Sequence, residues 1–256
     1  MKNSFQYSIQ GSGLPFFFQH GLGSERTQPQ VLLNNLNGVQ LISMDSMGHG
    51  TSPFTRPDDI SFDRFSDNLV ALADHLQIQN AVFGGISMVS GIALNIALRY
   101  PEYVRALILV RPAWLDVAFP ENLKLSGLLA DLIKRGNPEM LMESEEYKYW
   151  ERKEPGSAES LKNHALSNLP NYAYHIIHNM WADRPIQDLK DLRRIQIPVL
   201  ILASHQDFVH PFHYGEILFN HLPQAQLAEI PSRYVDTVGY ERESRKYIEE
   251  FLSFLV

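Results

Sequence analysis

Ser87 stands in the sequence GGISM, directly after the apolar stretch Ala81–Gly84 and before an apolar segment, Met88–Arg99, with helical spacing. A serine on a sharp turn between a strand and a helix has its hydroxyl above the strand ends, where it can act as a nucleophile. A serine that only caps the helix would show the same placement. The nucleophile interpretation therefore depends on three further groups: amides for an oxyanion, a base, and an acid that orients the base.

Backbone amides that could bind an oxyanion are expected at two positions. The sequence HGLGS, beginning at His20, follows the apolar run Leu14–Gln19, and glycines there allow an N–H group to face a developing negative charge. We expect the amides of Leu22 and Met88 to be the two donors, because the second donor of such a site is the residue after the nucleophile. His20 is expected to shape this loop rather than to transfer protons.

The elements around these residues follow an alternating pattern. Short apolar runs alternate with segments of helical period, which is typical of βαβ units and a mostly parallel sheet. The pattern predicts an α/β fold. Buried strands are expected at Leu14–Gln19, Val39–Met44, Ala81–Gly84, Ala106–Val110, Val199–Ala203 and Gln226–Ile230, and helices at Gln28–Leu36, Phe62–His75, Met88–Arg99, Phe212–His221 and Glu241–Phe254. Phe5–Ile9 is expected to pair with Leu14–Gln19 as an antiparallel hairpin at the sheet edge.

One long segment interrupts the alternation. Residues 113–185 contain no convincing strand and several helical patterns, and a stretch this long and rich in aromatic residues is too ordered for a loop. We interpret it as a helical cap inserted into an α/β core formed by residues 1–112 and 186–256. A lid over a pocket and a helical decoration that merely covers the sheet both fit this composition.

Five sequence segments in this order resemble the α/β-hydrolase superfamily, in particular small capped esterases, lactonases and enol-lactonase-like enzymes. The segments are HGLGS, MDSMGHGTS, GGISM, RALILV and IPVLILASHQDFVHP. The resemblance covers nearly the whole chain and implies a mostly parallel sheet flanked by helices, with the cap at its usual place. It also implies that Ser87 is the nucleophile and Asp207 the acid of a catalytic triad. Function does not follow from the fold alone, because this fold supports many chemistries.

The chain departs from the family where the triad histidine is expected. The superfamily order is serine, acid, histidine, with the histidine in the loop after the final strand. Here residues 230–243 contain no histidine, and counting back from the last helix places the catalytic position at Tyr240. A tyrosine, with a pKa near 10, is a poor base at neutral pH. Its hydroxyl could instead donate a hydrogen bond to a substrate carbonyl or oxyanion.

A second departure lies two residues after the serine. The superfamily usually has a small residue there, because the helix crosses close to the strand, whereas this chain has Val89. We therefore expect a shifted turn at Ser87 or a filled pocket floor.

Three other histidines could lie near the site. His210 follows Asp207 by three residues, and we favour a scaffolding role at a helix start over a role as substitute base. His175 and His178 are spaced three apart within the cap, where they could reach into a pocket. The same spacing suits metal ligation, but no third ligand is evident, and solvated or core histidines are the simpler interpretation.

Arg111 and Trp114 follow the run Ala106–Val110 and are expected near the strand ends. Arg111 could hold a substrate carboxylate with its forked guanidinium, or it could pair with Asp45 or Asp207 as part of the structure. We expect substrate contacts among His20, Arg111, Trp114, His175, His178 and His210.

The composition excludes several classes of function. The chain has 256 residues, no cysteine, and 22 basic against 29 acidic side chains, which give a formal net charge of −7. The absence of cysteine excludes disulfide scaffolds and catalytic thiols, and the negative charge disfavours nucleic acids and anionic membranes as partners. No export signal or membrane span is readable. We expect a cytoplasmic protein with a small-molecule substrate or ligand and no cofactor or metal; monomer and homodimer are both compatible with the sequence.

Three functions remain open from these observations. The first is a serine hydrolase with a modified triad, weak or altered in activity, that acts on a small ester, thioester or lactone. The second is a repurposed lyase, isomerase or cyclase in which Ser87 and Tyr240 serve as hydrogen-bonding groups. The third is a ligand-binding or sensing protein that has kept the pocket and lost the chemistry. The missing histidine counts against efficient hydrolysis, because triad variants retain only about 10³–10⁴-fold acceleration over water.

Overall fold

Seven strands form one sheet in the order β1-β3-β2-β4-β5-β6-β7 in the computed structural model, which describes residues 5–255. Every neighbouring pair is parallel except β1 with β3. The strands are β1 (Tyr7–Gly11), β2 (Leu14–Gln19), β3 (Val39–Met44), β4 (Ala81–Ile86), β5 (Val104–Val110), β6 (Val199–Ala203) and β7 (Ala225–Glu229). All six strands predicted from the apolar runs are present, so the predicted α/β architecture is confirmed, but β7, at the sheet edge, is half-buried to exposed rather than buried as expected.

The predicted hairpin between the first two strands is wrong. β1 pairs with β3, not with β2, and β3 lies between them. The turn after β1 packs against the start of β3: the amide of Leu14 donates to the carbonyl of Gly38, and a Cβ on Gly13 would lie 2.2 Å from that oxygen. β2 is buried along nearly its whole length, as expected for a strand with parallel neighbours on both sides.

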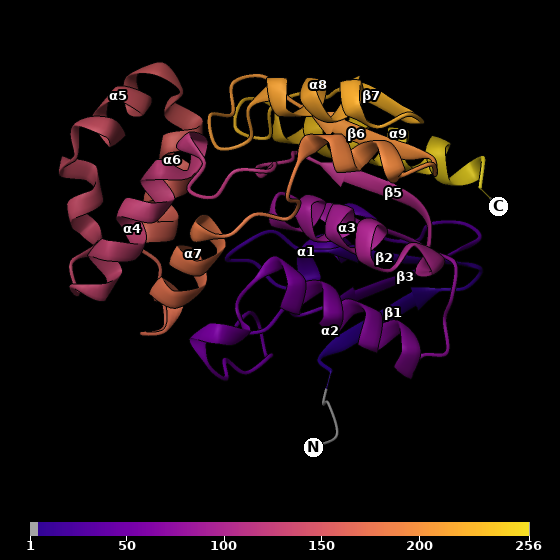
Figure 1. Cartoon of the computed structure of the whole chain (residues 1–256). Helices are drawn as coiled ribbons and strands as arrows, with labels where there is room; N and C mark the ends of the chain where they lie inside the picture. Colours follow the sequence, from indigo (N-terminus) through magenta and orange to yellow (C-terminus); the bar gives the residue numbers. More distant parts are fainter. Residues whose placement is uncertain (1–4, 256) are drawn as a thin grey trace.

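Helices cover both faces of the sheet (Figure 1). α2 (Phe62–His75), α3 (Met88–Arg99) and α8 (Phe212–His221) contribute to the apolar core on one face. α1 (Thr27–Leu32) and α9 (Thr237–Ser253) lie over the other face. Short 3₁₀ turns occur at Pro57–Asp59, Pro101–Tyr103, Glu121–Leu123, Pro138–Glu143 and Leu189–Arg194.

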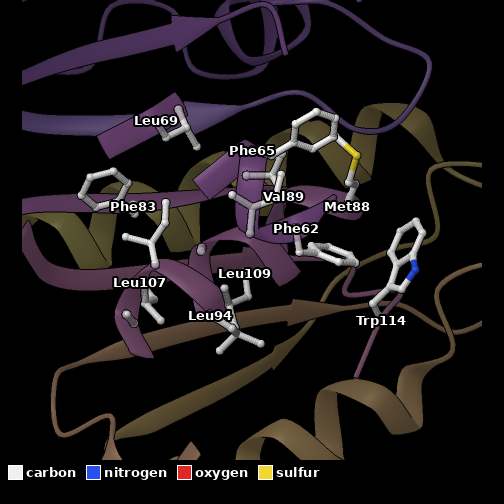
Figure 2. Close-up of a cluster of buried hydrophobic side chains, with 14 of the residues drawn as sticks. Phe62, Phe65, Leu69, Phe83, Met88, Val89, Leu94, Leu107, Leu109 and Trp114 are labelled. Carbon is white, nitrogen blue, oxygen red and sulfur yellow. The ribbon is translucent and has the colours of Figure 1, made fainter. Parts of the chain in front are cut away.

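The core below α2 and α3 holds the start of α3 in place. Figure 2 shows phenylalanines of α2 beside Met88 and Val89 of α3, with aliphatic side chains of the strands next to them. The labelled members of this cluster are all buried: Phe62, Phe65, Leu69, Phe83, Met88, Val89, Leu94, Leu107, Leu109 and Trp114. Because protein interiors are close-packed, this cluster fixes the position of the residue that precedes α3, which is Ser87.

The segment predicted as a cap is helical. Its helices are α4 (Lys124–Lys134), α5 (Glu145–Lys153), α6 (Pro155–Ala165) and α7 (Ala173–Ala182), and residues 113–185 contain no strand. The four helices stand together beside the sheet, between β5 and β6 in the chain (Figure 1), and share a small apolar cluster that also includes Phe208 from the loop after β6. The division into a core and a cap domain remains a prediction.

Candidate active site

Ser87 occupies the turn between β4 and α3 in a strained backbone conformation. Its φ is 58° and its ψ is −111°, values that a residue with a side chain rarely adopts. Such strain costs about 1–3 kcal/mol and persists only where the surroundings enforce it. Here the amide of Ser87 donates to the carbonyl of Val110 at the end of β5, over 2.9 Å. The strand–turn–helix context predicted from the sequence is thus present.

Val89 does not fill the floor of the cavity beside Ser87, so that part of the expectation from the sequence is wrong. Its side chain points into the α2–α3 core (Figure 2) and is 1% exposed. The space comes from Gly85, two residues before the serine: a Cβ there would lie 2.6 Å from Cγ1 of Val89 and 2.6 Å from the carbonyl oxygen of Gln19. A glycine before the serine therefore accommodates the branched residue after it.

His210 contacts the Ser87 hydroxyl. Its Nε2 lies 2.8 Å from Oγ of Ser87, and its Nδ1 lies 2.8 Å from Oδ1 of Asp207. All three side chains are buried. Parallel strands of one sheet explain the meeting, because Ser87 follows β4 while Asp207 and His210 lie beyond the end of β6, with β5 between these two strands. The predicted absence of a histidine beside Ser87 is therefore wrong, and so is the preference for a purely scaffolding role of His210.

The loop between β6 and α8 holds this histidine. The amide of His210 donates to the main-chain carbonyl of Asp207 over 3.1 Å, which closes a tight turn, and Pro211 precedes the start of α8. The turn folds the imidazole back onto the carboxylate of the same loop. A base three residues after the acid thus reaches the position that the family fills from the loop after the final strand.

Arg111 pairs with Asp207, which decides between its two predicted roles. Its Nε donates to Oδ2 of Asp207 over 2.7 Å, and its Nη2 lies 2.5 Å from the same oxygen. Nη2 also donates to the hydroxyl of Tyr234 over 2.9 Å. Asp45, the other predicted partner, instead pairs with Arg26. Arg111 also lines the cavity described below, so its charge lies at the site but is already partnered.

The charges around Asp207 set its ionisation. Burial alone would raise the pKa of Asp207, but the Arg111 guanidinium and the His210 imidazole beside it lower the pKa from 3.8 to about 2. Conversely, burial of the Arg111 guanidinium disfavours its charge, but the adjacent carboxylate of Asp207 together with the nearby Tyr234 and Tyr240 outweighs burial and raises the Arg111 pKa. Asp207 is therefore a carboxylate at neutral pH.

The carboxylate determines which nitrogen of His210 carries the proton. An ionised carboxylate can only accept hydrogen bonds, so Nδ1 of His210 is the donor to Asp207 and Nε2 is the acceptor for the Ser87 hydroxyl. Nη2 of Arg111 also lies 3.0 Å from Nδ1, and its two hydrogens have Asp207 and Tyr234 as partners. Burial and the charge of Arg111 lower the pKa of His210, whereas Asp207 opposes this change. The neutral imidazole is thus favoured, as a general base requires.

The Tyr240 hydroxyl forms no hydrogen bond with the triad, although the ring centroid lies 5.7 Å from the guanidinium carbon of Arg111. α9 begins at Thr237, capped by the Asp236 carboxylate, which accepts from the amide of Gly239 over 2.8 Å. Tyr240 therefore lies in the first turn of this helix and is 5% exposed, and its hydroxyl has no hydrogen-bond partner in residues 5–255. Its predicted catalytic position is wrong because the helix starts four residues before the expected Glu241. The residues of this loop that line the cavity are Arg233 and Tyr234.

A cavity of about 180 Å³ lies next to Ser87, between the strand ends and helices α4, α6 and α7. Leu22 and Trp114 line it, as predicted, and Nε1 of Trp114 donates to the carbonyl of Met180 over 2.9 Å. The full lining is Gly21, Leu22, Gln28, Ile86, Ser87, Arg111, Trp114, Leu123, Ser126, Leu129, Ser157, Ser160, Leu161, His164, Ile177, Val209, His210, Arg233 and Tyr234. Met88 turns its side chain into the core, and its amide is the first of α3, where N–H groups lack helical acceptors.

Three predicted substrate contacts lie elsewhere. His20 is buried next to the cavity-lining residues Gly21 and Leu22. Its Nε2 accepts a hydrogen bond from the amide of Ser46 over 3.0 Å, which fits the expected role of shaping this loop. His175 stacks on Phe54, and His178 is exposed. None of these three histidines lines the cavity. His175 and His178 lie on α7, which contributes Ile177 to the cavity instead. Across residues 5–255, no group of three or more His, Cys, Asp or Glu side chains is placed to hold a metal ion.

The sequence interpretation also missed cavity residues. Gln28, Ser157, Ser160, His164, Arg233 and Tyr234 line the cavity, but none belongs to a motif or directly follows a strand. Tyr234 lies in a loop, and Ser157, Ser160 and His164 lie in α6. Whether these residues line the cavity depends on how the loop and the helical segment fold. Only the absence of a histidine after β7 indicated that this loop was unusual.

Comparison with known proteins agrees with this geometry. The family model for the alpha/beta hydrolase fold matches residues 15–234, and the chain belongs to this family. A putative carbamate hydrolase, RutD, of Pseudomonas syringae pv. syringae is 25% identical over 235 residues, covering 88% of this chain and 90% of the relative. A 3-oxoadipate enol-lactonase of Acinetobacter baylyi is 26% identical, covering 77% and 73%.

A solved structure shares the fold. A thermophilic esterase from Thermogutta terrifontis superposes with a TM-score of 0.75 at 24% identity, covering 97% of this chain and 93% of the esterase. The family and its hydrolase relatives make hydrolysis the chemistry to consider first. In the part of the chain that the structure describes, no helix is long and apolar enough to cross a membrane.

Proposed function

We propose that this protein is a serine hydrolase that cleaves small carboxylic esters or lactones through an acyl-enzyme, with Ser87, His210 and Asp207 as its triad. The observation that carries the proposal is the pair of 2.8 Å contacts from His210, one to the Ser87 hydroxyl and one to the Asp207 carboxylate. A nucleophile, a base in contact with it and an orienting carboxylate are the parts that this chemistry requires.

The first half of the reaction forms the acyl-enzyme. Oγ of Ser87 attacks the substrate carbonyl carbon while Nε2 of His210 takes the hydroxyl proton. Asp207 holds the imidazole and stabilises the imidazolium that forms. The amides of Leu22 and Met88 are the expected donors to the oxyanion. The tetrahedral intermediate collapses when the C–O bond breaks and His210 returns its proton to the leaving alkoxide.

The second half releases the acid. Nε2 of His210 takes a proton from water, the hydroxide attacks the acyl carbon, and the ester bond to Ser87 breaks with return of the proton to Oγ. With a lactone the leaving alkoxide stays attached to the acyl group, so one hydroxy acid is released. The cavity volume of about 180 Å³ favours small substrates.

The alternative functions depended on a missing base. A non-hydrolytic enzyme that uses Ser87 with Tyr240 is disfavoured because the Tyr240 hydroxyl is enclosed without a partner in the described chain. A pure binding protein gives no reason for a serine held at a φ of 58° in contact with a buried histidine. Hydrolysis accounts for both features.

A fluorophosphonate probe and 4-nitrophenyl butyrate test the proposal. The wild-type protein should be labelled on Ser87 and should hydrolyse the ester, and Ser87→Ala should lose both activities. Ser12→Ala is the matched control, since this serine is exposed in the turn after β1, does not line the cavity, and should leave both readouts within about twofold of wild type. Labelling elsewhere, or unchanged hydrolysis by Ser87→Ala, would overturn the proposal.

A further inference from the structure

The cavity wall carries positively charged side chains and no carboxylate. Arg111 and Arg233 line it, whereas none of its lining residues is Asp or Glu. The chain as a whole has a net charge of −7, so the sign of the charge at the cavity is opposite to that of the protein. A cleft lined by one sign of charge favours ligands of the other sign.

The two arginines differ in their ion-pair partners. Arg111 is bound by Asp207, as described above, and its charge is largely compensated. Arg233 has no acidic side chain within ion-pair distance among residues 5–255, and its guanidinium lies 5.7 Å from the ring centroid of Tyr234. Arg233 is only half-buried, so water still reaches it. A substrate that displaced this water without supplying a negative charge would leave the cation poorly solvated.

The charge of Arg233 affects the proposed base, His210. Burial is the main cause of the lowered pKa of His210, and the charges of Arg111 and Arg233 lower it further, against the opposing effect of Asp207. Arg233 thus lies within electrostatic reach of the reacting groups. An anion bound to Arg233 would offset its charge and leave His210 a stronger base.

Uncharged polar groups complete this wall. Ser160 of α6 and Ser126 of α4 line the cavity, and their hydroxyls have no hydrogen-bond partner within the described chain. A hydroxyl can donate to a carboxylate oxygen as readily as it accepts from a donor. An arginine fork with hydroxyl donors around it is suited to a carboxylate.

We propose that the substrate is an anionic ester or lactone whose acyl part carries a free carboxylate, and that Arg233 binds this carboxylate. The inference rests on the proposed function and names its substrate class. The cavity of about 180 Å³ favours a short acyl chain between the ester carbonyl and this carboxylate. Arg233 is then a specificity residue, and Arg111 remains the partner of Asp207.

Matched esters test the charge preference. Mono-4-nitrophenyl succinate, glutarate and adipate present a carboxylate at increasing distance from the ester, and 4-nitrophenyl butyrate, valerate and hexanoate are neutral counterparts. We expect the wild-type protein to prefer at least one anionic ester over its neutral counterpart in kcat/KM. Arg233→Gln should lower kcat/KM for that ester by about 10- to 100-fold, the value of one charged hydrogen-bonding pair, and leave the neutral esters within about threefold.

Arg242→Gln is the control, because Arg242 lies on the exposed side of α9, paired with Glu243, and should change neither ester class. Equal hydrolysis of both classes by wild type, or an equal loss for both in Arg233→Gln, would overturn the proposal.

A binding measurement separates this inference from the proposed function. Calorimetric titration of glutarate into Ser87→Ala, and into Ser87→Ala with Arg233→Gln, needs no catalysis. We expect binding at least tenfold weaker in the double variant. If no ester is hydrolysed but glutarate binds in an Arg233-dependent way, only the proposed function fails. If esters are hydrolysed but glutarate binding does not depend on Arg233, only the charge inference fails.

Discussion

Replacement of Arg111 by methionine should destabilise the protein strongly at neutral pH. The Arg111 and Asp207 side chains are 2% and 0% exposed, and removal of one partner leaves the other charge buried without compensation. Such a loss typically costs about 3–5 kcal/mol.

The lowered pKa of Asp207 gives a second value for this loss of folding free energy, and it is smaller than the first. Its pKa falls from 3.8 to about 2, and each tenfold change in acid dissociation corresponds to about 1.4 kcal/mol, so the folded state favours the carboxylate by roughly 2 kcal/mol. Burial has already worked against this value, so the attraction of Arg111 and His210 together exceeds it. Arg111 is the largest single cause that lowers this pKa, so a loss of about 2 kcal/mol is expected in Arg111→Met.

Urea unfolding followed by tryptophan fluorescence measures this loss. Because the pKa of Asp207 is lowered, its contribution to stability is present above pH 3.8 and is lost as the pH falls towards 2. The difference between wild type and Arg111→Met should therefore shrink over that window. Arg56→Met is the control, since Arg56 pairs with Asp59 at a side-chain exposure of 64% and should cost less than about 1 kcal/mol. An Arg111→Met loss no larger than that of Arg56→Met would refute the reasoning.

Two further predictions concern His210 and Tyr240. Burial and the nearby arginines lower the pKa of His210, so its neutral form persists into mildly acidic solution. The acid limb of kcat/KM against pH should therefore have its midpoint below 6.5. A midpoint at or above 6.5 would contradict the assigned environment of His210. Tyr240→Phe removes a buried hydroxyl that has no partner in the described chain, so kcat and the free energy of unfolding should stay within about twofold and about 1 kcal/mol of wild type; a large drop in kcat would restore Tyr240 to the chemistry.

The sheet could be predicted from the sequence because its strands are continuous apolar runs. β2, β4, β5 and β6 are buried on both faces, and such strands carry a strong signal in the residues themselves. The pairing of β1 could not be predicted in the same way. Chain neighbours usually pair, whereas here β1 lies on the far side of β3 and the turn at Gly13 packs against Gly38.

The site could be predicted in part. Ser87 directly follows β4 and Asp207 lies in the loop that follows β6, so the ends of parallel strands in one sheet bring them together. His210 reaches Ser87 through the fold of one loop, and the sequence does not give the path of that loop. Tyr240 was misplaced because helix α9 starts earlier than its apolar pattern. Asp236 is a favoured capping residue and was the available signal for that start.

The central claim is that His210 is the base for Ser87, and the acylation rate of His210→Gln tests it most directly. Glutamine keeps much of the volume but cannot accept the serine proton at neutral pH. The initial release of 4-nitrophenolate, measured by stopped flow against Tyr240→Phe as the control, should be slower than wild type by roughly 10³-fold or more in His210→Gln. Acylation of His210→Gln at the wild-type rate would contradict the claim.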